Sequence, residues 1–480
     1  MKRRDFLTMC GLSAAGFLSA RAGLAKTDPK AKGSSLKGSK PNIILVFTDD
    51  MGWGELGCSG NKIIKTPNID KFHAESVRFT NYHVSTSCSP SRAQLMSGRH
   101  EFYGGVTHTT YGRGILNKDF TILPQYLKKA GYSTAIFGKW HLGSQEGYRP
   151  HDRGFDEAVY HHKGYMNSAN YFDPALYHNG EREKYKGYCT DLFFSKAMEW
   201  IEENKDKPFF CYLSTNAPHI PLVVEEKYKA MYKDSGLNEK RQIYYGMVTN
   251  IDDNFGILRK RIDEMGIADN TILIFMTDNG HAISSSTGAG HDGNGFLKPD
   301  GLYNAGMRGA KGQPWIGGAC VPFIIRWPGV MDMPRDDKTL CGALDLLPTF
   351  SELAGVSVDD PGVEGRSLTP LFKNKPEEFD SDRYLIVHKG RWPDGEVDAH
   401  KYIHAGVRGP RFSLVWDRKS NLELFDYIND PGETKNVIDQ FPEDVKKMTA
   451  FFDQWWEKVR PCMINDARNE RLMKEKSGNK

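Results

Sequence analysis

Four groups of charged or amide side chains each follow a short apolar segment of the kind that forms a buried strand. They are Asp49-Asp50, Lys139 with His141, His219, and Asp278-Asn279. The carboxyl ends of parallel strands lie along one edge of a sheet, and ligands bind in the crevice at that edge. A single polar residue at a strand end is often only a cap or a surface group. Four such groups from distant parts of the chain predict one polar site.

Asp49, Asp50, Asp278 and Asn279 provide only oxygen ligands, and three of them are anionic. Hard cations such as Ca²⁺ or Mg²⁺ prefer this ligand set, whereas Zn²⁺ prefers cysteine and histidine ligands. The alternative interpretation of Asp49-Asp50 is a turn that ends a strand. Two adjacent carboxylates at a buried strand end repel each other, however, and a cation offsets this repulsion. We therefore expect a metal site.

The segment from Cys88 to Arg99, CSPSRAQLMSGR, has the pattern of a short helix. Pro90 suits a first helical turn and Gly98 suits a C-terminal stop, so we expect Cys88 at the helix N-terminus. The free N–H groups and the positive end of the helix dipole favour an anionic substrate there. The alternative for Cys88, from its residue type alone, is a buried or reactive thiol.

These twelve residues resemble the signature of the type I sulfatases, C-x-P-S-R followed by x-x-L-x-S/T-G-R. In this formylglycine-dependent arylsulfatase family of the alkaline phosphatase superfamily, a maturation enzyme oxidises the cysteine to formylglycine (3-oxoalanine). Further blocks of the family pattern stand in family order between about residues 41 and 437. They are Gly131–Thr134, Gly138–Gly143, Arg153–Asp156, Ala217–Pro221, Thr277–Gly280, Arg308–Gly312, Val321–Gly329, Gly365–Leu368 and Asn429–Thr434.

The resemblance implies covalent catalysis at a modified Cys88. The hydrated aldehyde is a geminal diol, in which one hydroxyl attacks sulfur and expels the alcohol, and the other then collapses to release sulfate. In the family, Ca²⁺ is held by the residues that match the four oxygen ligands named above, together with the modified Cys88. Arg92 and Lys139 would support the oxygens of the diol.

The resemblance also implies roles for residues around the sulfate. His141 would be the base for collapse of the diol. Lys311 would bind sulfate and, with His219, would serve the leaving oxygen. Lys139 would contact the sulfate as well.

Substrate selection is expected outside the family blocks. Residues 144–190 are rich in Tyr, His and Asn, and residues 281–308 are rich in Gly and Ser. Loops of such length in a compact domain are usually functional. We expect His108 and His281 to contact substrate, and the alternative for each is a solvated loop residue. The aromatic loops, the export signal described below and the overall resemblance to the family favour a sulfated carbohydrate over a lipid or steroid.

Two alternative functions stay open. A phosphonate or phosphate ester hydrolase of the same superfamily can share the formylglycine and the metal cluster. An exported binding protein that has lost catalysis is disfavoured, because every mapped reacting position has the residue type of the family.

Apolar segments that alternate with helical segments position these groups. The strand candidates are residues 42–47, 133–137, 209–213, 271–276 and 322–327. The helix candidates are one beginning at Pro67 and those at residues 123–130, 191–203, 240–265 and 343–354. This alternation is typical of a mostly parallel sheet covered by helices on both faces. We predict an α/β fold, which the resemblance makes alkaline-phosphatase-like, with the catalytic domain over residues 41–375.

Beyond residue 375 the strand candidates are shorter and more polar. They lie at residues 384–388, 412–416 and 422–427, and a helix candidate follows at 442–459. We predict a smaller C-terminal α+β domain with a short antiparallel sheet over residues 376–466. Residues 467–480 are charged and are expected to form a disordered tail.

The N-terminus has the pattern of an export signal. Arg3 and Arg4 precede an uncharged stretch, and Ala20-Arg21-Ala22 fits a cleavage site. We expect a twin-arginine-type signal peptide over residues 1–25, a linker over 26–40, the twin-arginine export machinery as a partner, and a periplasmic or secreted protein. The alternative is a cytosolic tail with a chance arginine pair.

Charge and composition exclude several classes of protein. The chain has 64 Lys and Arg against 61 Asp and Glu, and nine basic and two acidic residues lie in the first forty. Residues 41–480 therefore carry 55 basic and 59 acidic residues, a net charge of −4, which argues against a nucleic-acid binder. No uncharged apolar run beyond the N-terminus approaches the ~20 residues of a membrane helix. We thus expect no integral membrane segment in the mature chain. The cysteine spacing indicates neither a zinc site nor a disulfide framework.

Overall fold

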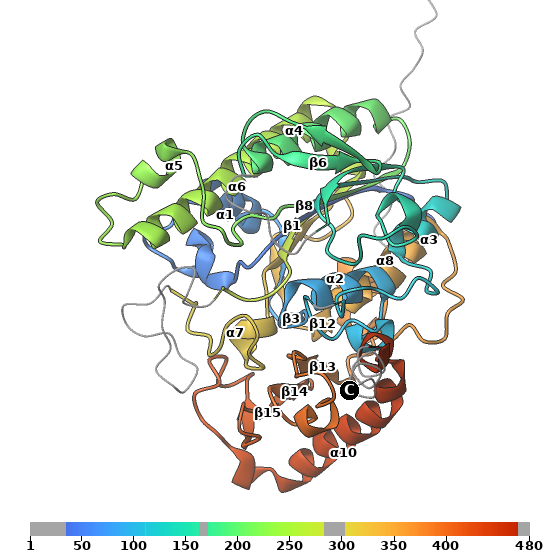
Figure 1. Ribbon diagram of the computed structural model, residues 1–480, viewed down its shortest axis with the longest axis vertical. Coiled ribbons are helices and arrows are strands. Elements are labelled where there is room, and N and C mark those ends of the chain that lie inside the picture. Colours follow the sequence, from blue (N-terminus) through green and yellow to red (C-terminus); the bar gives the residue numbers. More distant parts are fainter. Residues whose placement is uncertain (1–34, 111, 163–170, 283–302, 469–480) are drawn as a thin grey trace, which may run out of the picture.

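A computed structural model describes residues 35–110, 112–162, 171–282 and 303–468. Figure 1 shows the path of the chain. The predicted signal peptide, most of the linker and nearly all of the predicted tail lie outside the described residues. So do parts of the two segments expected to select substrate.

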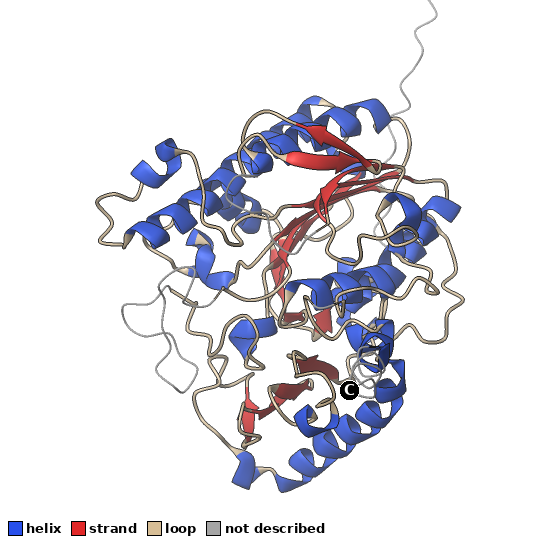
Figure 2. Ribbon diagram, viewed as in Figure 1, coloured by secondary structure: helices blue, strands red, loops and turns tan. Residues whose placement is uncertain are grey.

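A large mixed sheet forms the centre of the described structure (Figure 2). Its central strands, parallel to one another, are β9 (Thr271–Thr277), β1 (Asn42–Thr48), β8 (Phe209–Ser214), β4 (Ser133–Lys139) and β5 (Glu157–His161). Strands at its two sides are β10 (Phe323–Arg326), β2 (Val77–Phe79), β11 (Arg335–Asp337), β6 (Ala175–His178) and β7 (Glu181–Lys184). Within the described residues the order is β11-β2-β10-β9-β1-β8-β4-β5-β6-β7.

Helices cover both faces of this sheet. One face packs against α1 (Pro67–Ala74), α4 (Cys189–Asn204) and α6 (Glu239–Glu264). The other packs against α2 (Cys88–Ser97), α3 (Leu123–Lys129) and α8 (Leu346–Ala354). Shorter elements are α5 (Glu226–Ala230), α7 (Ile316–Ala319), α9 (Thr369–Phe372), and the two-stranded sheet of β3 (Tyr82–His83) and β12 (Cys341–Gly342).

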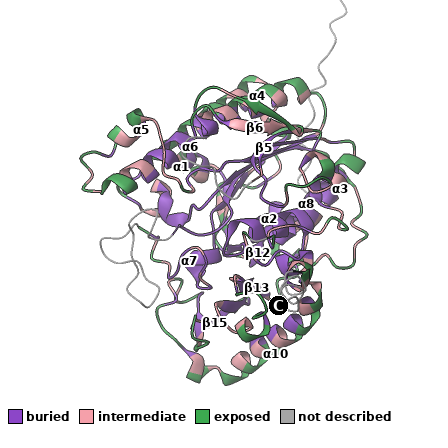
Figure 3. Cartoon of the chain, in the orientation of Figure 1, coloured by how far each residue is buried: buried purple, intermediate pink, exposed green. Residues whose placement is uncertain are grey.

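Strand β1 shows why the central strands are apolar throughout. Ile43 and Leu45 lie in the core beneath one layer of helices, and Ile44 and Val46 lie in the core beneath the other. Successive side chains of a strand point to opposite faces, so a strand covered on both sides needs an uninterrupted apolar run. Figure 3 shows the resulting buried centre.

The predicted α/β class is confirmed, and all five strand candidates of the large sheet are strands. β10 pairs antiparallel with β9, and so do β5 with β6 and β6 with β7. The sheet is therefore parallel in its centre and has antiparallel pairs toward both sides, while the edge pair of β11 and β2 is parallel. Sequence analysis did not predict β2, β5, β6, β7 or β11, because these segments are short or polar.

A separate antiparallel sheet lies in the C-terminal part of the chain. Its strands are β13 (Leu385–His388), β14 (Ala405–Arg408), β15 (Phe412–Trp416) and β16 (Leu422–Asp426). Helix α10 (Pro442–Val459) packs on it through Met448, Phe452 and Trp456. The expected short antiparallel sheet is confirmed. The domain boundary at 375 stays a prediction.

Within the part of the chain that the structure describes, no helix combines the length and the apolar character that crossing a bilayer requires. The seven cysteines in these segments are free thiols.

Candidate active site

The ends of four parallel strands bring the predicted polar groups together. The Lys139 ammonium pairs with the Asp49 carboxylate. Asn279 Nδ2 donates to Asp50 Oδ1 over 2.9 Å, and His219 Nε2 lies 3.4 Å from Asp50 Oδ2. The polar residues at these strand ends therefore form one cluster.

Close backbone packing at Gly138 positions Lys139 in this cluster. Gly138 has φ +119°, and an added Cβ would lie 1.8 Å from the carbonyl oxygen of Ser214 on the neighbouring strand. Only glycine permits this approach. The next side chain, Lys139, is completely buried and reaches Asp49.

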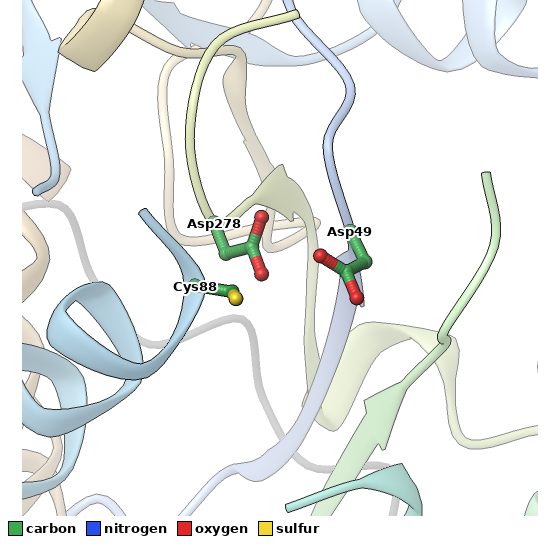
Figure 4. A group of neighbouring side chains, drawn as sticks. All are labelled: Asp49, Cys88 and Asp278. Atoms are coloured by element: carbon green, nitrogen blue, oxygen red, sulfur yellow. The ribbon is translucent and has the colours of Figure 1, made fainter. Parts of the chain in front are cut away.

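An acidic cluster lies beside the thiol of Cys88. Figure 4 shows the side chains of Asp49, Cys88 and Asp278 around a common space, and their ligand atoms lie within 4.8 Å of one another. Asp50 has φ +66°, an uncommon conformation for a residue with a Cβ. Its backbone N–H donates to Asp278 Oδ1 over 3.1 Å, so the two strand ends are joined directly.

Two buried oxygen atoms of this cluster have no hydrogen-bond partner, Asp49 Oδ1 and Asn279 Oδ1. A buried acceptor without a partner is costly unless an ion or ligand satisfies it. Burial, together with neighbouring negative charge, raises the pKa of Asp49 to about 6 and that of Asp278 to about 7. A cation would favour the ionised carboxylates, and the oxygen-rich donor set fits a hard cation.

Cys88 is the first residue of α2, and its side chain is buried. His141 Nδ1 lies 3.4 Å from Cys88 Sγ. The other ring nitrogen, Nε2, lies 2.8 Å from the carbonyl oxygen of Thr109 and must donate to it. This bond assigns the proton of the neutral ring to Nε2, so the lone pair of Nδ1 faces residue 88.

Arg92 lies behind the acidic cluster, fully buried. Its Nη2 donates to Asp278 Oδ2 over 2.9 Å, and its Nη1 donates to the backbone carbonyl of Lys139 over 3.0 Å. Nη1 also contacts Ser214 Oγ. The guanidinium thereby connects the ends of β4, β8 and β9. It holds the carboxylate layer in place.

His219 and Lys311 lie at the opening of the site. The Lys311 ammonium pairs with Asp50, and the side chains of Lys311 and His219 are 15% and 14% exposed. Lys139 is completely buried by comparison. His219 Nδ1 donates to the carbonyl of Ile220 over 2.8 Å, which leaves Nε2 directed at the site.

A cavity of about 550 Å³ opens over this cluster. Cys88, His141, His219 and Lys311 form its inner wall. Its other polar lining residues include Thr109, Ser144, Gln145, His162 and Arg391. The cavity gives a ligand direct access to residue 88.

Comparison with known families fits this geometry. Residues 41–356, well over half of the chain, match the family profile described as Sulfatase. This chain belongs to the sulfatase family. Residues 318–459 of the sulfatase also match a profile described as N-sulphoglucosamine sulphohydrolase, C-terminal.

Individual relatives support the same assignment. N-acetylgalactosamine-6-sulfatase of Homo sapiens is 30% identical over 371 residues, which cover 70% of this sulfatase and 67% of the relative. The solved structure of Ps i-CgsB in complex with k-i-k-neocarrahexaose is similar, with 29% identity, a TM-score of 0.76, and coverage of 87% and 92% of the two chains. A phosphonate monoester hydrolase of Agrobacterium radiobacter shares the fold, with 19% identity, a TM-score of 0.61, and coverage of 89% and 96%. The predicted type I sulfatase is confirmed, and the protein is a sulfuric ester hydrolase.

The structure places His281 of this sulfatase beneath the site rather than on its surface. The imidazole is completely buried, and its Nδ1 lies 2.7 Å from Glu55 Oε1. Tyr244 lies against its ring. His281 is not among the residues lining the cavity over Cys88. In this position His281 stabilises the wall of the site and is shielded from a ligand in the cavity.

His108 lies just outside the cavity lining, next to Thr109 and Thr110. The backbone N–H of Thr110 donates to His108 Nδ1 over 3.0 Å. Burial and nearby cations, of which Arg391 has the largest effect, together lower the pKa of His108 to about 3. An uncharged His108 at this place supports the rim of the sulfatase site.

Arg391 and Thr109 line the cavity but were not predicted from the sequence. Arg391 Nη2 donates to Thr109 Oγ1 over 3.1 Å. No family block contains either residue. The only sequence signal was the pair of basic residues, Lys389 and Arg391, around Gly390.

Proposed function

We propose that this sulfatase hydrolyses sulfate esters of carbohydrates through a formylglycine made from Cys88 and a bound Ca²⁺. The observation that carries the proposal is the position of Cys88, at a helix N-terminus and within 3.4 Å of His141 Nδ1. Asp49 and Asp278 of the acidic cluster lie beside it as well. A hydrated aldehyde at residue 88 supplies one hydroxyl for attack on sulfur and a second that expels sulfate.

The calcium ligands in this proposal are Asp49, Asp50, Asp278 and Asn279, together with the modified Cys88. The partnerless oxygens of Asp49 and Asn279 support this set. Bound Ca²⁺ would act as a Lewis acid that neutralises charge on sulfate and on the hydroxyl of residue 88. Lys139, fixed on Asp49, would hold a positive charge beside sulfate, and Arg92 would keep Asp278 ionised and oriented.

His141 would remove the proton that permits collapse at residue 88. Its Nδ1 faces the reacting position, and Thr109 holds the ring in the required tautomer. Positioned bases of this kind contribute about 10²–10⁴ in rate.

Lys311 and His219 would serve the sulfate and the departing alcohol oxygen. Both line the cavity, and both contact the Asp50 carboxylate. A sugar alkoxide is a poor leaving group, so it requires a proton or a cation as it departs.

A carbohydrate sulfate as substrate is supported by two comparisons. A curated relative is named N-acetylgalactosamine-6-sulfatase, and the similar solved structure was determined with a neocarrahexaose. The polar cavity lining of Thr109, Gln145 and His162 suits sugar hydroxyls. Sulfate release from a panel of sulfated mono- and disaccharides by matured enzyme tests this class.

The shared fold of the phosphonate monoester hydrolase keeps phosphonate or phosphate esters as the second candidate. Rates on 4-nitrophenyl sulfate and on the matched phosphate ester distinguish the two. We expect the sulfate ester to be preferred, and a preference for the phosphate ester would contradict the proposal.

We also propose maturation by a formylglycine-generating enzyme and twin-arginine export to the periplasm. Cys88 is only 2% exposed in the folded chain, which supports oxidation by a large maturation enzyme before or during folding. Twin-arginine export carries folded proteins and is compatible with that order. The variant Arg3→Lys with Arg4→Lys should leave the protein in the cytoplasm. Unchanged periplasmic levels would contradict this proposal.

A further inference from the structure

A second cavity, also of about 550 Å³, extends from the active site toward the C-terminal sheet. Asp50, His219 and Lys311 belong to its lining, so it begins at the opening of the active site. Four other lining side chains, each basic or an imidazole, form what we call the basic wall, and one of them, Arg391, also lines the first cavity. These are Lys389, Arg391, His404 and Arg418.

The basic wall is built by loops at one end of the antiparallel sheet. Lys389 and Arg391 follow β13, His404 precedes β14, and Arg418 follows β15. The backbone N–H of Lys389 donates to the carbonyl of His404 over 3.0 Å, and that of His404 donates to the carbonyl of Asp417 over 3.1 Å. Regular sheet hydrogen bonding thus holds these side chains side by side.

Within the described segments, the cations of the basic wall lack the carboxylate partners that basic residues usually have. Among the described residues, Lys389, Arg391 and Arg418 form no ion pair, whereas Arg411 on the same sheet pairs with Asp426. Grouped cations without counter-charges repel one another. Burial and the charge of Arg391 accordingly lower the pKa of Lys389. An anion bound among them would relieve this repulsion.

Backbone strain and an unsatisfied donor mark the same place. Arg391 has φ +63° and His404 has φ +51°, conformations that are uncommon for side chains of this size. Such strain occurs preferentially at ligand sites. The buried Nε of Arg391 has no hydrogen-bond partner, although Nη2 contacts Thr109. The guanidinium therefore retains donor capacity for a ligand.

We propose that the basic wall binds a second anionic group on the alcohol portion of the substrate, so that the enzyme selects sugars with two anions. The inference rests on the proposed function, in which His219 and Lys311 serve the leaving oxygen. These two residues line both cavities, so a sugar whose hydroxyls contact the first cavity can extend past them into the second cavity. A sulfate ester and a uronic acid carboxylate share the required chemistry, a compact anion that accepts several hydrogen bonds.

The test uses matured enzyme and matched sugar substrates. All members of a set share one sugar and one scissile sulfate. The first member carries no second anion, the second carries an additional sulfate, and the third carries a neighbouring carboxylate. We expect kcat/KM to be at least about tenfold higher for a member with a second anion than for the member without one. The member with the higher kcat/KM shows whether that second anion is a sulfate or a carboxylate. Lys389→Gln and Arg391→Gln should each reduce this selectivity ratio by about tenfold.

Two further variants make the test specific. Lys389→Arg keeps the charge and should restore most of the selectivity. Lys419→Gln removes an exposed charge next to Arg418 that lines neither cavity, and the ratio should stay unchanged. Arg418 is exposed, so Arg418→Gln allows the selectivity ratio to be measured if the variants at the partly buried positions fail to fold. Thermal melting identifies any such failure.

Equal kcat/KM across each hydrolysed set would overturn the inference, as would an unchanged ratio in the Lys389, Arg391 and Arg418 variants. Failure of the proposed function gives a different result. In that case matured wild-type enzyme releases no sulfate from any set or from 4-nitrophenyl sulfate.

Discussion

His141 Nδ1 lies 3.4 Å from the Sγ atom of Cys88. The opposite ring nitrogen is held by the carbonyl of Thr109 at 2.8 Å, and the backbone of His141 is in the left-handed region with φ +61°. A conformation this uncommon indicates that the surrounding structure enforces the orientation of the ring. The bond from Nε2 to Thr109 keeps the lone pair of Nδ1 directed at residue 88.

Replacing His141 should separate the two halves of the reaction. In His141→Ala, each enzyme molecule should still attack 4-nitrophenyl sulfate once. The steady-state rate should fall by about 10²–10⁴, because the release of sulfate from residue 88 has lost its base. Rapid-mixing kinetics should then show a burst of about one nitrophenol per site. Equal loss of burst and steady rate would contradict this role. Thr109 holds His141 through its backbone carbonyl, so Thr109→Ser, which also keeps the side-chain hydroxyl that accepts from Arg391, is a suitable control.

Removing the thiol should abolish activity without unfolding the protein. Cys88→Ala deletes one sulfur atom at the surface of the cavity, so we expect a change in melting temperature of only a few degrees. Peptide mass mapping of the wild type, co-expressed with a maturation enzyme, should find an aldehyde at residue 88. Cys462→Ala, at a partly exposed cysteine far from α2 in sequence, should stay active. Full activity of Cys88→Ala would contradict the mechanism.

Calcium should stabilise the fold as well as support turnover. We expect about one Ca²⁺ per chain and a melting temperature that rises with added Ca²⁺, since a ligand at 100 times its Kd contributes about 2.7 kcal/mol. Asp278→Asn should weaken binding by more than about tenfold, because it removes charge from a ligand carboxylate. Asp269→Asn, at an exposed residue just before β9, should bind normally. Stoichiometric zinc in active, unchelated enzyme would contradict the assignment.

His219 should matter most when the leaving group is poor. We expect His219→Ala to reduce turnover of a sugar sulfate by about 10²–10⁴, and turnover of 4-nitrophenyl sulfate far less, because nitrophenolate leaves without an acid. His178→Ala, on the outer strand β6, should affect neither substrate. Equal losses on both substrates would remove His219 from the acid role and favour Lys311.

Glu101 should make stability depend on pH. Its carboxylate is completely buried, accepting hydrogen bonds from Ser85 and Gln94 at 2.6 Å, and burial raises its pKa from 4.5 to about 7. The folded state therefore retains a proton that the unfolded state loses. The stability present below pH 4.5 should decline as pH rises to about 7, by about 3 kcal/mol in total.

Glu101→Gln removes that titration. Its stability relative to wild type should increase by about 3 kcal/mol between pH 4 and pH 8, as measured by urea unfolding. Glu377→Gln, at an exposed position, should show no such change. A difference between Glu101→Gln and wild type that is constant with pH would contradict the assignment.

The sequence determined the central sheet and the inner layer of the site. Strands such as β1 and β9 are continuous apolar runs that can only be buried on both faces, and the polar residues directly after them must lie at one sheet edge. Cys88 at a helix N-terminus followed from Pro90 and Gly98, whose conformational preferences act locally. These features depend on residues adjacent in the chain.

Only the tertiary structure decided the outer layer. The tautomer of His141 depends on the carbonyl of Thr109, 32 residues away in sequence. The burial of His281 depends on Glu55, and the basic wall depends on how loops beyond residue 388 dock beside Lys311. The sequence does not distinguish a charged loop residue that faces bulk solvent from one that faces a cavity. Its electrostatic role is set by the neighbours that folding brings within a few ångströms, because charge interactions weaken with distance and with exposure to water.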